Sequence, residues 1–316
     1  MPPEKQENYT ALSLKKPPPS VILSRNGGGY IMLDNGQELK LIAFDLDGTF
    51  LDDQKAIPEE NLQAIRAAAE HGIYIVPATG RLYDGLPAQL RELDFIRYFI
   101  LINGAKVYDV KEDSVLFSAD LPNELVLSLF ENAESVGCLY DCYLRDEGLM
   151  SRGLYDALDD FVPDKVYLRY MRSIRKPVED LKTLVREDGG PVQKVQYFFQ
   201  DMQERRRQLD TLAERFPGIK VTSSLPMNIE INASNASKGP ALDALCRRLG
   251  FTAENAMAFG DNTNDLDMLL TAGHGVAMKN SDAKLFPAAD AVTSHDNNAA
   301  GVGKTIMEFL NQRSFL

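Results

Sequence analysis

Two carboxylates stand two residues apart where an apolar run ends. The run Leu39–Phe44 has the composition of a strand buried inside a parallel sheet, and Asp45, Leu46, Asp47 and Gly48 follow it directly. Gly48 suits a tight turn, so both acids can face one crevice and together hold a hard cation. An aspartate-rich turn would explain a single strand end equally well, so the other strand ends decide between the two interpretations.

Polar groups also follow two further predicted strands. Thr79 and Gly80 come just after a strand predicted at Ile73–Pro77, where a hydroxyl and a backbone N–H can meet a phosphate oxygen. A strand predicted at Ala256–Phe259 runs into Gly260–Asp265, a cluster of acids and amides of which helix capping explains one side chain and hardly four. Ligands gather at the carboxyl ends of such strands, so these groups favour one shared site.

Lys238 opens a predicted helix directly after Ser237. A lysine there adds a point charge to the positive end of a helix, which suits an anion. Alone, Lys238 is better explained as a solvated surface lysine, and Thr79 as a helix cap. Their positions relative to the aspartates are what favour phosphate chemistry.

Strands and helices alternate along much of the chain, which indicates an α/β protein with a doubly wound, Rossmann-like parallel sheet. Helices are predicted at Pro58–His71 and near Leu82–Leu93, and a third buried strand at Tyr98–Ile102. After Lys238 the pattern resumes with a helix through Leu249, the strand at Ala256–Phe259, and helices at Asp265–Leu270 and Gly303–Leu310.

The middle of the chain differs in pattern and predicts an inserted α+β domain at residues 116–227. It combines helices near Asn123–Ser135, Val178–Arg186 and Gln203–Phe216 with short alternating strands around Cys138–Ser151. Residues 39–115 and 228–316 then form the core domain. Residues 1–38, with a triple proline and a triple glycine, are predicted to be a flexible or loosely attached arm.

Charge and cysteine content exclude several classes of protein. The net charge is -12 and the pI is about 4.8, so a nucleic-acid backbone would be repelled and nucleic acid is not an expected partner. Three scattered cysteines form neither a disulfide framework nor a zinc site, which favours a reducing cytoplasm. No segment approaches the ~18 apolar residues of a membrane span, so no membrane partner is expected.

In combination, these residues resemble the four motifs of the haloacid dehalogenase-like phosphotransferase superfamily. The resemblance runs from about Leu39 to Leu310. Further strings make it similar to the Cof-type phosphatases (subclass IIB), whose large α/β cap is inserted between the second and third motifs. The motif residues are Asp45 with Asp47, Thr79, Lys238, and Asp261 with Asp265, and the further strings are Asn103–Ala105, Ser237–Gly239 and Gly275–Met278.

The resemblance implies roles in phosphoryl transfer, which needs a nucleophile, charge neutralisation and a proton for the leaving group. Asp45 would attack phosphorus to form an aspartyl-phosphate, and Asp47 would act as the acid and then as the base. Mg2+ would be held by Asp45, the main-chain carbonyl of Asp47, and Asp261. Asp265 would orient Lys238 or a metal-bound water.

The resemblance also implies which groups hold the phosphoryl oxygens. They are Thr79, the Gly80 N–H and Lys238, with the backbone at Leu46 and the Asn264 amide as further donors. The core contacts mainly the phosphoryl group, so the inserted cap is expected to recognise the rest of the substrate, and its closure would exclude water.

We therefore expect a Mg2+-dependent phosphatase acting on a small phosphorylated metabolite: a sugar phosphate, a nucleotide or a phosphorylated cofactor. Two alternatives stay open at this stage. One is a phosphomutase or phosphotransferase on the same core, which would pass phosphate to a sugar rather than to water. The other is a binding protein that keeps the fold without turnover.

Overall fold

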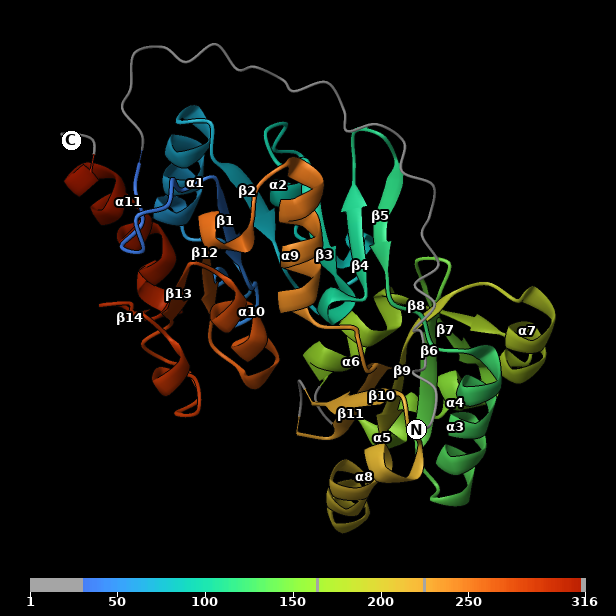
Figure 1. Cartoon of the computed structure of the whole chain (residues 1–316). Coiled ribbons are helices and arrows are strands. Elements are labelled where there is room, and N and C mark those ends of the chain that lie inside the picture. Colours follow the sequence, from blue (N-terminus) through green and yellow to red (C-terminus); the bar gives the residue numbers. More distant parts are fainter. Residues whose placement is uncertain (1–30, 163–164, 224–225, 314–316) are drawn as a thin grey trace, which may run out of the picture.

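The computed structural model describes residues 31–162, 165–223 and 226–313. Figure 1 shows two α/β bodies side by side, with the chain leaving the first after β5 and returning to it at α9. The first body is built on a five-stranded sheet in the order β14-β13-β12-β1-β2, and every neighbouring pair is parallel. Its strands are β1 (Leu41–Phe44), β2 (Tyr74–Pro77), β12 (Ala256–Gly260), β13 (His274–Ala277) and β14 (Ala291–Val292).

Helices cover both faces of this sheet, as the alternation in the sequence predicts. Ile42 and Phe44 of β1 pack in the cluster that includes α1 (Glu59–Glu70) and α11 (Gly301–Arg313). Leu41 and Ala43, which point to the opposite face, pack with α9 (Lys238–Leu249) and α10 (Leu266–Thr271). The doubly wound core is therefore confirmed, and the carboxyl ends of β1, β2 and β12 open at one edge.

A small antiparallel sheet continues the core beside β2. It consists of β3 (Tyr98–Leu101), β4 (Lys106–Asp109) and β5 (Ser114–Ser118), and β3 meets the main sheet through a parallel bridge between Ile100 and Ala78. The helix predicted at Leu82–Leu93 is wrong in extent. The structure has a 3-10 turn, η1 (Tyr83–Gly85), and a single α turn, α2 (Ala88–Arg91), because Pro87 between them has no N–H to continue a helix.

The inserted domain is the cap, an α+β unit around a six-stranded sheet in the order β10-β11-β9-β6-β7-β8 (Figure 1). Its strands are β6 (Leu139–Leu144), β7 (Glu147–Ser151), β8 (Arg175–Val178), β9 (Val192–Phe198), β10 (Ile219–Thr222) and β11 (Asn228–Ala233). Its helices are α3 (Asn123–Ser135), α4 (Arg152–Asp156), α5 (Leu158–Phe161), α6 (Lys165–Ser173), α7 (Leu181–Asp188) and α8 (Met202–Arg215).

The structure differs from the sequence prediction at two places in the cap. The helix expected from Val178 begins only at Leu181, since the Asp180 side chain caps its first turn and β8 occupies the residues before it. Strand β11 pairs with β9 and β10, so we propose that the cap extends to Ala233, beyond the predicted boundary at 227.

The last residues of the predicted N-terminal arm pack against the core. Residues 31–38 turn back on themselves through a bridge between Met32 and Glu38, with Ile31 and Leu33 buried in the core. This part is therefore not loosely attached. The prediction for residues 1–30 falls outside the described residues.

Candidate active site

Side chains from four core elements meet at the open edge of the parallel sheet. Asp45 follows β1, Thr79 follows β2, Asp261 follows β12, and Lys238 is the first residue of α9. Their backbones are fixed by the sheet, because the Asp45 N–H donates to the Phe259 carbonyl of β12 at 3.0 Å. Asp45 and Asp261 are 216 positions apart in the sequence, and the neighbouring strands β1 and β12 bring them to the same edge.

Lys238 is a buried cation between two carboxylates. Its Nζ donates to Oδ1 of Asp45 at 2.5 Å and to Oδ1 of Asp265 at 2.6 Å, and its side chain is fully buried. Burial lowers the pKa of Lys238, but Asp265 and Asp45 outweigh this and raise the pKa above its usual range. Lys238 is therefore a fixed positive charge, and the surface-lysine alternative is wrong.

Three carboxylates crowd around this cation. One oxygen each from Asp45, Asp261 and Asp265 lies within 4.8 Å of the others. Burial, opposed by Lys238 and reinforced by Asp265 and Asp261, raises the pKa of Asp45 well above its usual range. Burial and then Asp265 raise the pKa of Asp261 to about 7. The cluster thus holds more negative charge than one ammonium compensates.

The donor set of this cluster fits a divalent hard cation. Mg2+ prefers carboxylate and carbonyl oxygens and is bound in proteins by one or two carboxylates with waters. Asp45 and Asp261 supply such oxygens, and their pKa values are raised first by burial and then by the neighbouring acids, both of which a bound cation would offset. Asp261 is also oriented by the Thr49 hydroxyl, which donates to its Oδ1 at 2.7 Å.

Two contacts set Asp265 apart from its neighbours in the cluster. Its Oδ2 accepts the backbone N–H groups of Asp261 at 3.0 Å and of Asn262 at 3.1 Å. Its Oδ1 accepts Lys238. Asp265 is completely buried and holds both the lysine and the turn that carries Asp261. These contacts suit a residue that orients Lys238 and the Asp261 turn.

Asp47 points to a different pair of cations. Nε and Nη2 of Arg81 donate to its two carboxylate oxygens at 2.8 and 2.7 Å, and Nζ of Lys55 lies 2.8 Å from Oδ1. Burial alone would raise the pKa of Asp47, but the hydrogen bonds and charge of Arg81, with Lys55, lower it to about 2. The side chain is thus held ionised, and no sequence argument assigned Arg81 or Lys55 to the site.

The predicted phosphate-binding groups lie around the same edge. Thr79 is buried, and its Oγ1 accepts the Arg81 N–H at 3.3 Å. Leu46 is buried beside Asp45. Nδ2 of Asn264 donates to Oδ1 of Asn103 at 3.4 Å, and a Cβ atom on Gly80 would lie 2.7 Å from that same oxygen. Asn103 therefore connects the segments that carry Gly80 and Asn264.

Sequence reasoning missed two residues that the cap contributes. Nζ of Lys194 on β9 donates to the Gly80 carbonyl at 2.9 Å and pairs with Glu230 of β11 at 3.3 Å. Glu230 in turn accepts Nδ2 of Asn103 at 2.7 Å. The available signal was a lysine inside a strand whose other residues are largely apolar, but its partners lie far away in the sequence.

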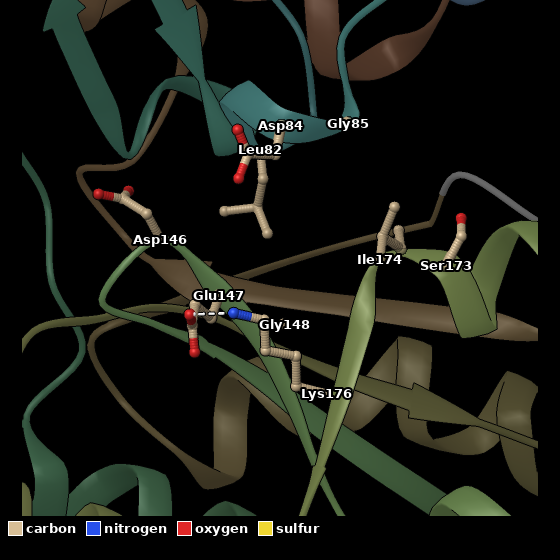
Figure 2. A pocket seen from close by; sticks show the side chains of 9 residues that line it. All are labelled: Leu82, Asp84, Gly85, Asp146, Glu147, Gly148, Ser173, Ile174 and Lys176. Carbon is tan, nitrogen blue, oxygen red and sulfur yellow. Dashed lines mark hydrogen bonds and ion pairs between the residues drawn. The ribbon is translucent and has the colours of Figure 1, made fainter.

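A cavity of about 110 Å³ opens between the core and the cap (Figure 2). Leu82 and Gly85 line it from the core, while Asp146–Gly148 and Ile174 line it from the cap. Figure 2 shows the ion pair of Glu147 with Lys176 on the cap side and Leu82 projecting from the core side. The guanidinium of Arg81 donates to Asp47 and also to the Gly85 carbonyl, the latter at 3.1 Å. Arg81 therefore links Asp47 to a residue that lines the cavity.

Comparison with known proteins identifies the family. Residues 42–306 match the family described as haloacid dehalogenase-like hydrolase. The chain is 30% identical over 283 residues to the 5-amino-6-(5-phospho-D-ribitylamino)uracil phosphatase YcsE of Bacillus subtilis (strain 168), covering 86% of this chain and 96% of that protein.

Two solved structures share the fold. A haloacid dehalogenase-like hydrolase from Bacteroides thetaiotaomicron matches with a TM-score of 0.74 and 29% identity, over 86% of this chain and 99% of that one. The HAD subclass IIB sugar phosphatase BT4131 matches with a TM-score of 0.70 and 22% identity, over 85% of this chain and 98% of that one, a likeness in fold.

The chain belongs to the haloacid dehalogenase-like hydrolase family. The resemblance to this family and the architecture of a core with an inserted cap are confirmed. Membership, together with a relative named as a phosphatase, also supports the prediction of phosphatase activity. Among the described residues, no helix has the length and apolar character needed to cross a membrane.

Proposed function

We propose that this protein is a Mg2+-dependent phosphatase that transfers the phosphoryl group of a small metabolite to Asp45 and then to water. One observation carries the proposal: the Asp45 carboxylate lies at the strand edge between a fixed ammonium, Lys238, and a second acid, Asp261. A nucleophile, a positive charge for phosphoryl oxygens and a cation site are thus combined in one place.

In the first step an oxygen of Asp45 forms a bond to phosphorus while the ester P–O bond breaks, and the electron pair stays on the leaving oxygen. Asp47 supplies the proton that this oxygen needs. In the second step Asp47 takes a proton from water, the water oxygen bonds to phosphorus, and the Asp45–phosphorus bond breaks. This returns Asp45 as a carboxylate and Asp47 as an acid.

The contacts of Asp47 suit the role of a base more directly than the role of an acid. Arg81 and Lys55 keep the carboxylate ionised, as a base requires. For the acid role, Asp47 must first take up a proton from solvent, which requires that substrate binding draw at least one of these cations away from it. Lys55 is the easier one to move, because its side chain is 57% exposed whereas that of Arg81 is 14% exposed.

The phosphoryl oxygens would be held by Lys238, the Thr79 hydroxyl, the Gly80 N–H, the Leu46 backbone and the Asn264 amide. Asp45, Asp261 and the Asp47 carbonyl would hold Mg2+, which supplies charge neutralisation for the transferring group. Asp265 would keep Lys238 and the Asp261 turn in place.

The cavity beside Asp47 indicates what kind of leaving group fits. Carboxylates of Asp84, Asp146 and Glu147 line it, together with one lysine that Glu147 already pairs with. Such a lining accepts hydrogen bonds from hydroxyls or amines and repels a second phosphate. We therefore propose a phosphorylated polyol or amino-polyol, a class that includes the ribityl phosphate in the name of the Bacillus subtilis relative.

Phosphate release from p-nitrophenyl phosphate tests this function. The expected result is turnover that requires Mg2+, stops with a chelator, and falls at least about a thousandfold in Asp45→Asn. Asp53→Asn is the matched control, because Asp53 is an exposed acid on the same loop that bonds Asn297 and Asn298 instead of the cluster. Activity that survives the chelator or Asp45→Asn would refute the proposal.

A further inference from the structure

The cap sheet turns a polar stripe of β9 toward the core. Tyr197 and Val195 point to the opposite face, where the Tyr197 hydroxyl donates to the Leu129 carbonyl of α3 at 2.5 Å. Lys194 and Gln196 alternate with them and so occupy the other face. Lys194 is 1% exposed. A lysine is almost never fully buried unless it is paired, and Lys194 is paired with Glu230.

The ammonium of Lys194 acts on one peptide group of the phosphate-binding loop. Its Nζ bonds the Gly80 carbonyl at 2.9 Å, and the N–H of the same peptide, from Arg81, donates to Thr79 Oγ1 at 3.3 Å. The carbonyl end of this peptide is thereby fixed by the cap. Because Thr79 Oγ1 already accepts this N–H, its hydroxyl proton can be donated to a phosphoryl oxygen.

Glu230 extends the contact to a second phosphate-binding segment. It pairs with Lys194 and accepts Nδ2 of Asn103, whose Oδ1 accepts the Asn264 amide. Asn103 has a φ of 57° and Ile102, a β-branched residue, a φ of 54°. Left-handed conformations of this kind persist only where the surroundings fix them, and Glu230 is one of the groups that does so.

We infer that Lys194 and Glu230 are positioning residues through which the cap orders the phosphate-binding groups Gly80, Thr79 and Asn264. The inference rests on the proposed function. It implies that phosphoryl binding depends on a pair of charges from the cap, in addition to the core motifs. An ion pair with this role differs from one that only holds the cap against the core. The chain contains an ion pair of the second kind, which serves for comparison.

The comparison contact joins Lys106 of β4 to Asp146 of the β6–β7 turn. Their 2.5 Å ion pair also connects core to cap, and Lys106 is 4% exposed. In the described part of the chain, the Lys106 ammonium contacts Asp146 and the Tyr108 ring, and no contact joins it to Gly80, Thr79 or Asn103. If these ion pairs served only to hold the cap against the core, breaking the Lys194–Glu230 pair or the Lys106–Asp146 pair would have the same effect on phosphate binding.

The experiment uses the full chain with Mg2+ and two variants. The first combines Lys194→Met with Glu230→Gln, which removes both buried charges and so leaves no uncompensated ion, while the new amide oxygen can still accept Nδ2 of Asn103. The second is Lys106→Met alone, because Asp146 is 54% exposed and stays solvated without its partner. The readouts are the dissociation constant of inorganic phosphate by calorimetric titration, and kcat and KM for p-nitrophenyl phosphate.

We expect the Lys194 and Glu230 variant to weaken phosphate binding and raise KM about tenfold, with kcat changed less. In Lys106→Met, the dissociation constant of inorganic phosphate, which has no leaving group, should stay within about twofold of the wild-type value. Lys194→Arg, which keeps a donor, should retain most of the affinity. If the double variant fails to fold, Lys194→Gln, which is too short to reach Gly80, takes its place with the same expected loss.

Equal phosphate affinity in wild type and the Lys194 and Glu230 variant would overturn the inference and leave the proposed function standing. Equal losses in this variant and in Lys106→Met would also overturn it, because they would show a general fastening of the cap. A wild-type protein that neither binds phosphate nor hydrolyses p-nitrophenyl phosphate would overturn the proposed function, and the inference with it.

Discussion

The backbone of Gly48 passes so close to Asp261 that a Cβ atom on the glycine would lie 2.4 Å from the carboxylate Oδ2. Gly48 also has a φ of 84°, which side chains rarely adopt. The loop after β1 and the loop after β12 can therefore approach each other only with glycine at this position, and this approach brings Asp261 next to Asp45.

Gly48→Ala tests that approach. We expect a loss of about 2–3 kcal/mol in the free energy of unfolding, combining the conformational cost with displacement of Asp261, and a lower affinity for Mg2+. Gly72→Ala is the control, since Gly72 has a φ of 78° but open space around its Cβ position. It should lose only about 1 kcal/mol by denaturant unfolding and keep its Mg2+ affinity. Equal effects on Mg2+ binding would contradict the account.

Lys238→Met should destabilise the protein strongly and abolish turnover. The change leaves Asp45 and Asp265 buried without their ammonium, and breaking a buried pair in this way costs about 3–5 kcal/mol. Arg247→Ala, at a 75% exposed residue paired with Asp243, should change the unfolding free energy by less than about 1 kcal/mol. Urea titration followed by circular dichroism measures both, and a loss no larger than the control's would show that the lysine is not integral to the cluster.

Mg2+ should raise the thermal unfolding midpoint of the wild-type protein. A cation bound by Asp45 and Asp261 relieves their repulsion, and a ligand at 100 times its dissociation constant stabilises the folded state by about 2.7 kcal/mol. Asp261→Asn should lose most of this shift, whereas Asp243→Asn, at a surface ion pair, should keep it. A shift of equal size in Asp261→Asn would place the cation elsewhere.

Ile174→Phe should discriminate between substrates by the size of their leaving groups. The larger ring would fill part of the cavity between core and cap, so KM for a polyol phosphate should rise about tenfold, a typical effect of a poorly fitting leaving group. Acetyl phosphate, with a small leaving group, should be hydrolysed as before. Leu270→Phe, at a residue 64% exposed on the core, is the control and should change neither substrate.

The local pattern in the sequence was sufficient to predict the core. Strand β1, helix α1 and helix α9 lie within two residues of their predicted ends, because buried parallel strands and amphipathic helices leave strong periodic signals. The placement of Asp45, Thr79 and Lys238 at strand ends and at a helix start also followed from the pattern, whereas their burial did not.

Contacts between distant segments could not be predicted in the same way. The pairing of Asp47 with Arg81 and the contact of Lys194 with Gly80 depend on how side chains from separate loops and from the cap meet in space. The 3-10 turn at Tyr83–Gly85 was also mispredicted as part of one helix, which Pro87 interrupts in the structure.

Borohydride trapping during turnover tests the central claim, that Asp45 carries the phosphoryl group. Borohydride reduces an acyl phosphate to an alcohol, so an aspartyl-phosphate becomes homoserine, which peptide mass spectrometry can locate. We predict homoserine at position 45 when p-nitrophenyl phosphate and Mg2+ are both present, and aspartate there when either is omitted. Phosphate release with aspartate intact at position 45, or with homoserine at another position, would contradict the account.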